Sequence, residues 1–405
     1  MGKLEAPLRK ITLGTLNISP TGKHYVNICL NDNRLSRGFY TERFEREFAA
    51  LHGCKHGIFM NSGTSALQVS LAALKEIHDF PPGSEVIVPA TTFIATSNIV
   101  LQNNLKPVFV DVDPDTFNID MNKIRDAITP RTRCIIPVHL FGLPADMWYL
   151  TSMLSMMGRE DIKIIEDSCE TMFASQSGKS VGSWGDLACF STYVAHLIVG
   201  GVGGLVTTND DKLAEICRSL MAHGRNAIYT NIDDDNNVTD EKLKDIVERR
   251  YQFERVGYSY RATELEAAIA LSELERYEIN IQTRRDNACY LTSLLRRLEP
   301  LSLQLPWTPR KSQHSFMMYP MVCASWVDRD DFLMYLETRG IETRYLFPLL
   351  SQPVYKNLFP GEDEKFPVAQ RLAKQGFFIG MHQGLTLEDM DYVSETIHTY
   401  FREHA

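Results

Sequence analysis

A glycine and small hydroxyl residues stand directly before an expected helix. Gly63, Thr64 and Ser65 lie at the start of residues 65–77, whose apolar side chains recur at helical spacing. Backbone N–H groups at a helix start, together with hydroxyl side chains, form a cradle for a phosphate group. An ordinary helix N-cap has the same composition. This segment alone is therefore compatible with a phosphate-binding loop or with a simple cap.

Two acidic residues, Glu166 and Asp167, close the apolar run at residues 163–167, which is typical of a buried strand. The carboxyl ends of parallel strands are where α/β sheets bind their ligands. A carboxylate at that place can pair with a protonated ring nitrogen and strengthen a pyridine ring as an electron sink. A helix cap by Asp167 explains the same residues equally well.

Ser191 and His196 lie five residues apart, and a glycine-rich stretch follows at residues 200–204. This loop combines a hydroxyl that can bind phosphate with an imidazole that titrates near neutral pH. A lone loop histidine with no special role is the commoner case. We interpret His139 and His223 as structural.

The elements that position these residues follow from the hydrophobic pattern. Over residues 1–280, short apolar runs alternate with amphipathic stretches, which predicts βαβ units around a mostly parallel sheet. The expected strands are residues 85–89, 107–111, 134–138 and 163–167, and helices are expected at 264–277 and 285–298. The polar segment 231–244 is expected to be an exposed insertion or a mobile loop.

The remaining residues, 281–405, are expected to form a smaller C-terminal α/β domain. Its predicted strands are residues 315–322 and 341–344, and its predicted helices are 329–339 and 385–401, with Thr386 as the cap of the last. The expected fold class is therefore α/β, with a large domain at 1–280 and a small one at 281–405.

Composition narrows the function. The chain has 405 residues and a net charge of -9, which argues against broad contact with nucleic acid or an anionic membrane. The start lacks the apolar core of a signal peptide, so we expect a cytoplasmic protein. Its 8 cysteines include no C-x-x-C pair, so no metal site is expected from them.

Several short segments occur in one order along nearly the whole chain: Leu35-Ser36-Arg37-Gly38, Asn61-Ser62-Gly63-Thr64-Ser65-Ala66, Pro89-Ala90-Thr91-Thr92-Phe93, Val138-His139-Leu140-Phe141-Gly142, Glu166-Asp167, Gly182-Ser183-Trp184-Gly185-Asp186, Cys189-Phe190-Ser191, Gly257-Tyr258-Ser259-Tyr260-Arg261 and Gly340-Ile341-Glu342-Thr343-Arg344. In order and spacing they resemble the DegT/StrS family of sugar aminotransferases that depend on pyridoxal 5′-phosphate (PLP). The resemblance implies the fold type I, aspartate aminotransferase-like architecture. It also implies PLP or pyridoxamine 5′-phosphate (PMP) as the cofactor.

The resemblance implies a set of cofactor-binding residues: Gly63, Thr64, Ser65, Phe93, Asp167, Glu170, Ser191 and Ser259. The first three and Ser191 would hold the phosphate, and Phe93 would stack on the pyridine ring. Asp167 would pair with the ring nitrogen, and Glu170 would lie near the ring's 3-hydroxyl. Ser259 stands where the family has a residue that reaches across a homodimer to the phosphate, which implies composite active sites.

The chain departs from the family at its Schiff-base lysine, because His196 occupies that position. The stretch 191–196 resembles the histidine-containing branch of sugar 3-dehydratases, of the GDP-4-keto-6-deoxymannose 3-dehydratase type. This resemblance implies PMP bound without a covalent link, His196 as the base, and a nucleotide-linked 4-keto sugar as the substrate. Residues 226–251 contain no cysteine, so we expect no iron–sulfur cluster and expect glutamate to be the amino donor.

Two alternatives stay open at this point. One is amine transfer to a sugar or nucleoside-like carbonyl, with His196 moving the proton. The other is a non-catalytic PLP-binding homologue. Arg344 is a candidate for binding a substrate phosphate or a donor carboxylate, because its planar fork suits either, but it could equally pair with Glu342 or Asp389.

Overall fold

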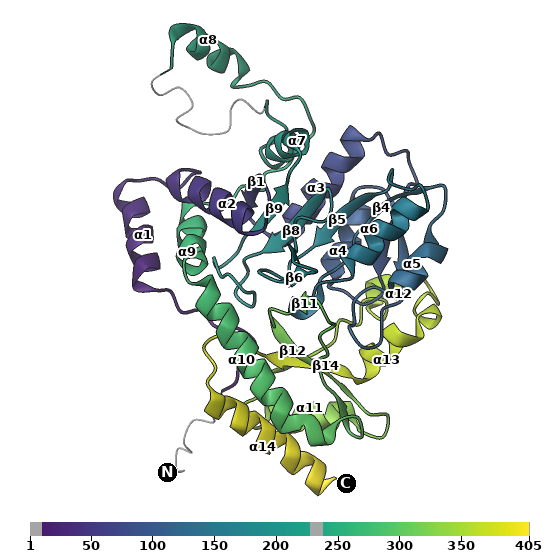
Figure 1. The fold of residues 1–405 in the computed structure, drawn as a ribbon. Coiled ribbons are helices and arrows are strands. Elements are labelled where there is room, and N and C mark those ends of the chain that lie inside the picture. The colour runs from purple at the N-terminus through teal and green to yellow at the C-terminus, as the bar shows by residue number, and fades with distance from the viewer. Residues whose placement is uncertain (1–9, 227–237, 405) are drawn as a thin grey trace.

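A seven-stranded sheet forms the centre of the molecule, and the computed structural model describes residues 10–226 and 238–404 (Figure 1). The strand order is β1, β9, β8, β5, β4, β2, β3. Their bounds are β1 (His56–Met60), β2 (Glu85–Pro89), β3 (Lys106–Val110), β4 (Thr132–Ile135), β5 (Lys163–Asp167), β8 (Leu187–Ser191) and β9 (Gly204–Thr208). Within this sheet only β9 runs against the others, which confirms the predicted α/β fold with a mostly parallel sheet.

Helices cover both faces of this sheet, and the alternation of side chains along β2 shows why. Val86 and Val88 pack into one core, whereas Ile87 between them packs into another on the opposite face. The first face carries α3 (Gly63–Ile77), α4 (Ile94–Gln102) and α7 (Asp211–Met221). The second carries α1 (Pro20–Asn31), α2 (Phe39–Leu51), α5 (Met121–Ala127), α6 (Met147–Met156) and α9 (Glu264–Leu274).

A second, antiparallel sheet is built from C-terminal residues in the order β10, β12, β14, β13. Its strands are β10 (Leu303–Gln304), β12 (Met318–Cys323), β13 (Thr343–Tyr345) and β14 (Gly376–Gly380). Its core is shared with α10 (Tyr277–Leu295), α11 (Arg329–Glu337) and α14 (Leu387–Glu403), while α12 (Pro353–Leu358) and α13 (Pro367–Gln375) complete the region. A small third sheet joins β6 (Ser175–Gln176), β7 (Lys179–Ser180) and β11 (Ser312–Gln313).

The N-terminal segment crosses to the C-terminal sheet. The Ile11 N–H donates to the Gly340 carbonyl at 2.7 Å, and the Ile11 carbonyl accepts from the Glu342 N–H at 2.9 Å. Ile11 is fully buried among the C-terminal core residues. The N-terminal segment therefore packs against the C-terminal part of the chain, beyond the domain boundary predicted at residue 280.

The polar segment 231–244 falls partly outside the described residues, which omit 227–237. Its last residues are helical rather than an irregular loop, because Asp240 begins α8 (Asp240–Arg249). Thr239 caps this helix, and two acidic residues occupy its first turn, where their negative charge interacts favourably with the helix dipole. Figure 1 shows α8 away from both large sheets. Among the described residues, none of the helices is both long and apolar enough to cross a bilayer.

Candidate active site

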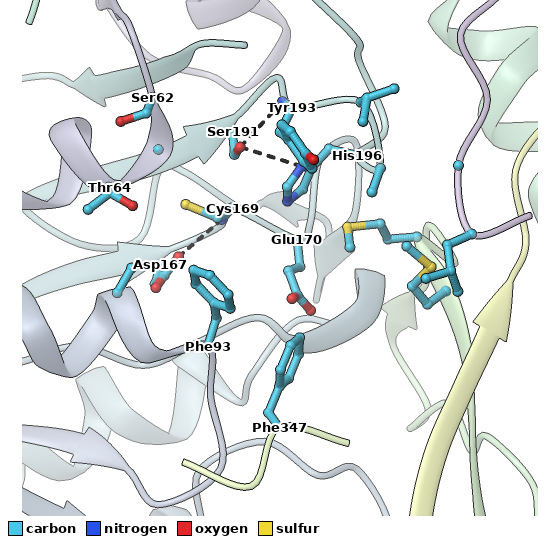
Figure 2. A pocket seen from close by; sticks show the side chains of 18 of the residues that line it. Ser62, Thr64, Phe93, Asp167, Cys169, Glu170, Ser191, Tyr193, His196 and Phe347 are labelled. Carbon is cyan, nitrogen blue, oxygen red and sulfur yellow. Dashed lines mark hydrogen bonds between the residues drawn. The ribbon is translucent and has the colours of Figure 1, made fainter. Parts of the chain in front are cut away.

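A cavity of about 730 Å³ lies where the central sheet meets the C-terminal sheet. Its wall combines the ends of β5 and β8, the N-termini of α3 and α4, the N-terminal segment and residues of β12 and β13. Figure 2 shows Thr64, Asp167, Ser191 and His196 gathered around this space. The three motifs, which the sequence spreads over residues 63–196, therefore meet at one site, at the carboxyl ends of parallel strands.

Helix α3 points its N-terminus at the cavity. Its cap is Ser62, whose hydroxyl accepts from the Ser65 N–H at 3.0 Å, and Gly63 and Thr64 line the cavity. A Cβ atom at Gly63 would lie 2.8 Å from the Cys169 sulfur, so only glycine leaves this corner open. The first N–H groups of a helix lack intrahelical acceptors, and they make this corner suited to an anion.

Ser65, the third residue of the predicted phosphate cradle, is placed differently. Its side chain is buried and does not line the cavity. Its hydroxyl donates to Asn61 Oδ1 at 2.7 Å and accepts from the Ser62 hydroxyl at 2.9 Å. Ser65 thus braces the turn before α3, while Asn61 and Ser62 take places in the cavity wall.

Asp167 is a buried carboxylate at the end of β5. It accepts from the Thr96 hydroxyl at 2.7 Å and from the Cys169 N–H at 3.2 Å. Among the described residues no lysine or arginine forms an ion pair with it, and burial raises its pKa. A protonated ring nitrogen would supply the missing cation, so Asp167 fits the predicted role.

Glu166, its neighbour, faces the opposite side of the strand. Its carboxylate accepts from the backbone N–H groups of Gly182, Trp184 and Gly185, and it lies 3.0 Å from His139 Nε2. Because His139 Nδ1 accepts from the Ala145 N–H, its Nε2 must be the donor to Glu166. Glu166 and His139 therefore form a structural pair outside the cavity.

Glu170 lines the cavity with a carboxyl group that accepts from the Phe141 N–H at 3.0 Å. Burial, reinforced by the nearby charge of Asp167, raises its pKa to about 8. The group is therefore mostly protonated at neutral pH and can donate a hydrogen bond to an oxygen in the cavity.

Ser191 is the last residue of β8 and His196 lies on the loop that follows, and His196 Nδ1 is 3.4 Å from the Ser191 hydroxyl (Figure 2). The Tyr193 ring stands edge-on to the imidazole, with ring centroids 6.0 Å apart. Burial, together with the positive charge of Arg284, lowers the pKa of His196 to about 4, so the imidazole is neutral at physiological pH. Among the described residues no lysine lines the cavity.

Phe93, at the cap of α4, is 55% exposed and presents its ring to the cavity. Phe347, from the C-terminal part of the chain, stands edge-on to it with centroids 6.2 Å apart. Phe347 also stacks on Phe141 at 5.3 Å. The exposed face of Phe93 leaves room for a planar ring, and stacking on the cofactor stays a prediction.

Arg344 also lines the cavity, and its side chain is paired with Glu342 at 2.7 Å. Glu342 in turn accepts from the Leu13 N–H at 3.1 Å, so this pair ties the N-terminal segment to the site. Ser259 lies outside the cavity of its own chain, where it is exposed and accepts from Arg261 at 2.9 Å.

Sequence reasoning missed Thr96, Phe347 and the N-terminal residues that wall the cavity. Thr96 had a signal, because it lies one helical turn after Thr92 and the two hydroxyls are 2.8 Å apart. Phe347 had none, since its place in the site depends on how the two sheets pack. Among the described residues no group of three His, Cys, Asp or Glu side chains is arranged to hold a metal ion.

The site as a whole fits a phosphate-bearing pyridine. A helix N-terminus and the Ser191 hydroxyl can bind a phosphate, and the exposed ring of Phe93 can stack on an aromatic face. The buried carboxylate of Asp167, which pairs with no lysine or arginine among the described residues, can bind a protonated ring nitrogen. These groups lie around one cavity, so one molecule of PLP or PMP could contact all of them.

Comparisons with known proteins agree with this site. Residues 17–398 match a family model described as the DegT/DnrJ/EryC1/StrS aminotransferase family. The chain is 35% identical over 390 residues to GDP-perosamine synthase of Caulobacter vibrioides, an alignment that spans 95% of this chain and 97% of that protein. It is 30% identical over 364 residues to GDP-4-keto-6-deoxy-D-mannose 3-dehydratase of Yersinia pseudotuberculosis, spanning 87% and 89% of the two chains.

Solved structures agree as well. The fold is similar to that of E. coli GDP-4-keto-6-deoxy-D-mannose-3-dehydratase with bound hydrated PLP, with a TM-score of 0.84 and 26% sequence identity. That similarity covers 96% of this chain and 99% of the other. The expected PLP fold type I architecture is thereby confirmed.

Proposed function

We propose a reaction for this chain from the premise that it belongs to the DegT/DnrJ/EryC1/StrS aminotransferase family. Within that family it is a PLP-dependent enzyme that modifies sugars. The proposed reaction is 3-dehydration, in which a nucleotide-linked 4-keto sugar loses its 3-hydroxyl group. The observation that supports it is His196, a neutral base in a cavity that no lysine lines among the described residues.

The binding residues divide the cofactor between them. The N–H groups at the start of α3, with Thr64 and Ser191, would hold the phosphate, and Asp167 would hold the ring nitrogen. When bound, PMP supplies an amine that condenses with a carbonyl group and a ring that withdraws electrons. Glu170, as a neutral acid, would donate a hydrogen bond to an oxygen beside the ring. Arg344 is proposed to bind an anionic group of the sugar nucleotide or of the donor.

His196 would move the proton. Its Nδ1 faces the Ser191 hydroxyl, so we assign proton exchange with the substrate to Nε2. The lowered pKa leaves the imidazole free to accept a proton at physiological pH, and a weak base of this kind returns the proton readily to a departing hydroxyl group.

The overall reaction balances with glutamate as the proposed donor. Breaking the C3–O bond and replacing the hydroxyl by hydrogen requires two electrons, and oxidation of glutamate to 2-oxoglutarate and ammonia supplies them. We therefore expect purified protein with PLP, ¹⁵N-glutamate and a GDP-linked 4-keto-6-deoxy sugar to form a 3-deoxy sugar and equimolar ¹⁵N-ammonia. Absence of both products across several nucleotide-linked 4-keto sugars would refute the proposed reaction.

Amine transfer is the second candidate, and the 35% identity to a GDP-perosamine synthase favours it. The same experiment separates the two reactions, because amine transfer would place the ¹⁵N label in the sugar and release no ammonia. A non-catalytic PLP-binding homologue would give neither product. It would also exchange the 4′-protons of bound PMP with solvent no faster than free PMP does.

His196→Lys tests the geometry of the site. An amine at this position should reach the carbonyl of PLP, so the variant should gain a visible absorbance band and, after borohydride treatment, the mass of one reduced PLP adduct. The His196→Asn variant is the matched control and should show neither. If His196→Lys also stays unmodified, residue 196 does not face the cofactor.

We further propose a homodimer in which Ser259 completes the partner's phosphate site. Ser259 is exposed and lies outside its own cavity, and Val256 beside it is 98% exposed. Light scattering should give twice the chain mass. Ser259→Ala should weaken PMP binding, while a surface change far from this loop, such as Met156→Ala, should not.

A further inference from the structure

Arg284 is a buried cation directly behind the loop that carries His196. It lies in the middle of α10, which runs from the central sheet to the C-terminal elements (Figure 1). The Arg284 side chain is 2% exposed. Its guanidinium donates to the Met317 carbonyl at 3.0 Å and to Gln383 Oε1 at 3.1 Å. Longer bonds of 3.4 Å reach the carbonyls of Phe316, Met381 and His196.

This charge is stabilised by carbonyl dipoles rather than by a carboxylate. Among the described residues no Asp or Glu oxygen lies within 4.0 Å of its nitrogens. Burial lowers the pKa of Arg284 to about 9, partly offset by the more distant Glu273, so the group stays charged at neutral pH. A buried charge is costly compared with an apolar side chain of similar size, which means that packing alone does not explain it.

The partners of Arg284 come from three segments that surround the site. His196 belongs to the loop after β8, Met317 lines the cavity just before β12, and Met381 follows β14. A single planar group with several fixed donors thus ties the catalytic loop of the central sheet to the C-terminal sheet. The two walls of the cavity are held in register through this residue.

We propose that Arg284 is a positioning residue for His196, because it fixes the main chain of the loop that presents the imidazole. Its positive charge also disfavours the imidazolium form of His196. This proposal rests on the proposed function of His196 as the base. Arg284 touches neither the cavity nor a bound group, since it is absent from the cavity wall. Its influence therefore passes through the carbonyl of His196 and through the electric field at the imidazole.

The other ionisable groups around His196 also contribute to the electric field at its imidazole, and several of them carry no net charge at neutral pH. Tyr193 is on the same loop as His196, and the rest of the cavity contributes Asp167, Cys169, Glu170, Glu342 and Arg344. Glu342 and Arg344 neutralise each other at 2.7 Å, and Glu170 is mostly protonated at neutral pH. His382 also interacts with Arg284, and burial, with the charge of Arg284, lowers the pKa of His382 to about 4 as well.

Arg285 provides a matched control on the same helix. It too is an arginine that donates to backbone carbonyls, at 2.8 Å to His314 and 3.2 Å to Phe173, but it does not contact the His196 loop. The experiment compares Arg284→Gln and Arg284→Lys with Arg285→Gln and Arg285→Lys in the full-length, cofactor-free protein. The His196 resonance of histidine-labelled protein is assigned by its loss in His196→Asn and followed through a pH titration by NMR.

The proposal makes distinct predictions for the two substitutions. Arg284→Gln should raise the midpoint of the His196 titration by about one pH unit, a tenfold change in proton affinity, whereas Arg285→Gln should leave it unchanged. Arg284→Lys keeps the charge but not the planar set of donors. It should keep the low midpoint, yet increase amide hydrogen exchange of residues 192–203 well above the level in Arg285→Lys.

Two results would overturn the proposal. One is an unchanged His196 midpoint in Arg284→Gln. The other, which decides the case if Arg284→Gln fails to fold, is an exchange pattern of Arg284→Lys identical to that of Arg285→Lys. The His196 titration and the amide hydrogen exchange use neither substrate nor turnover, so their results do not depend on which reaction the enzyme catalyses. A failure of 3-dehydration would leave them valid, and a failure of the Arg284 effect would leave the proposed reaction untouched.

Discussion

At the residue scale, the adjacent acids Glu166 and Asp167 have different surroundings, because successive side chains of a strand point to opposite faces. Asp167→Asn should weaken PMP binding by about 10- to 100-fold, since it removes the charge that pairs with the ring nitrogen. Glu166→Gln should instead lower the free energy of unfolding by about 2 kcal/mol, because it disturbs a buried network of backbone donors. Titration of PMP fluorescence and urea denaturation measure the two effects. Equal effects of both variants on PMP binding would contradict the assignment.

Glu170 should make the stability of the cofactor-free protein depend on pH. Its folded-state pKa of about 8 lies above the ordinary value of 4.5, so folding takes up a proton between these limits. Stability contributed by this group is therefore lost as the pH rises from about 5 to 8. Glu170→Gln, which keeps the shape and cannot titrate, should remove up to about 1.4 kcal/mol per pH unit of that slope. Parallel stability curves for both proteins from pH 5 to 8 would refute this prediction.

At the element scale, the sequence predicts a helix end where a capping residue marks it. Thr386 caps α14, with Asp389 completing the capping box. Thr386→Ala should lower the free energy of unfolding by about 1 kcal/mol. Thr239→Ala, at the cap of α8, is the matched control and should have a smaller effect, because α8 has only Ile246 buried and can fray without global unfolding. Urea denaturation of both variants checks this difference.

Other element boundaries were not predictable from local pattern. The strand expected at residues 134–138 ends as a regular strand at Ile135. Pro137 has no N–H for the ladder, and beyond it Val138 forms only an isolated bridge with Asp167. The helix expected at residues 285–298 begins earlier, at Tyr277, and so places Arg284 in its interior. Apolar periodicity located both elements but left their ends to tertiary contacts.

The whole molecule depends on the crossing of its N-terminal segment. Ile11 bonds to the C-terminal sheet and is fully buried in its core, although it is more than 300 residues from its partners. Ile11→Ala should lower the free energy of unfolding by roughly 2–5 kcal/mol. Leu16→Ala, in the same segment but 53% exposed, should change it by less than about 0.5 kcal/mol. Guanidinium denaturation measures both free energies of unfolding. If the two variants lose the same small amount, Ile11 does not contribute to the stability of the core.

This crossing also bears on how the chain divides. We retain a boundary near residue 280 as a proposal, with α10 spanning it and the N-terminal segment joining the C-terminal part. The cavity lies between the two sheets, so residues from both parts, such as Phe93 and Phe347, face each other in it.

The sequence by itself determined the α/β class and the parallel core strands, because buried strands and helix starts follow from local pattern. The shared site of Thr64, Asp167, Ser191 and His196 was implied by the resemblance to a known family, since local pattern left each motif open. Only the tertiary structure placed Asp167 in the cavity wall and Glu166 outside it, turned Ser65 away from the cavity, and brought Phe347 into the cavity wall and Arg284 behind the His196 loop. The physical reason is that side-chain direction, burial and the field at a titrating group depend on contacts between segments far apart in the chain. Local periodicity does not encode those contacts.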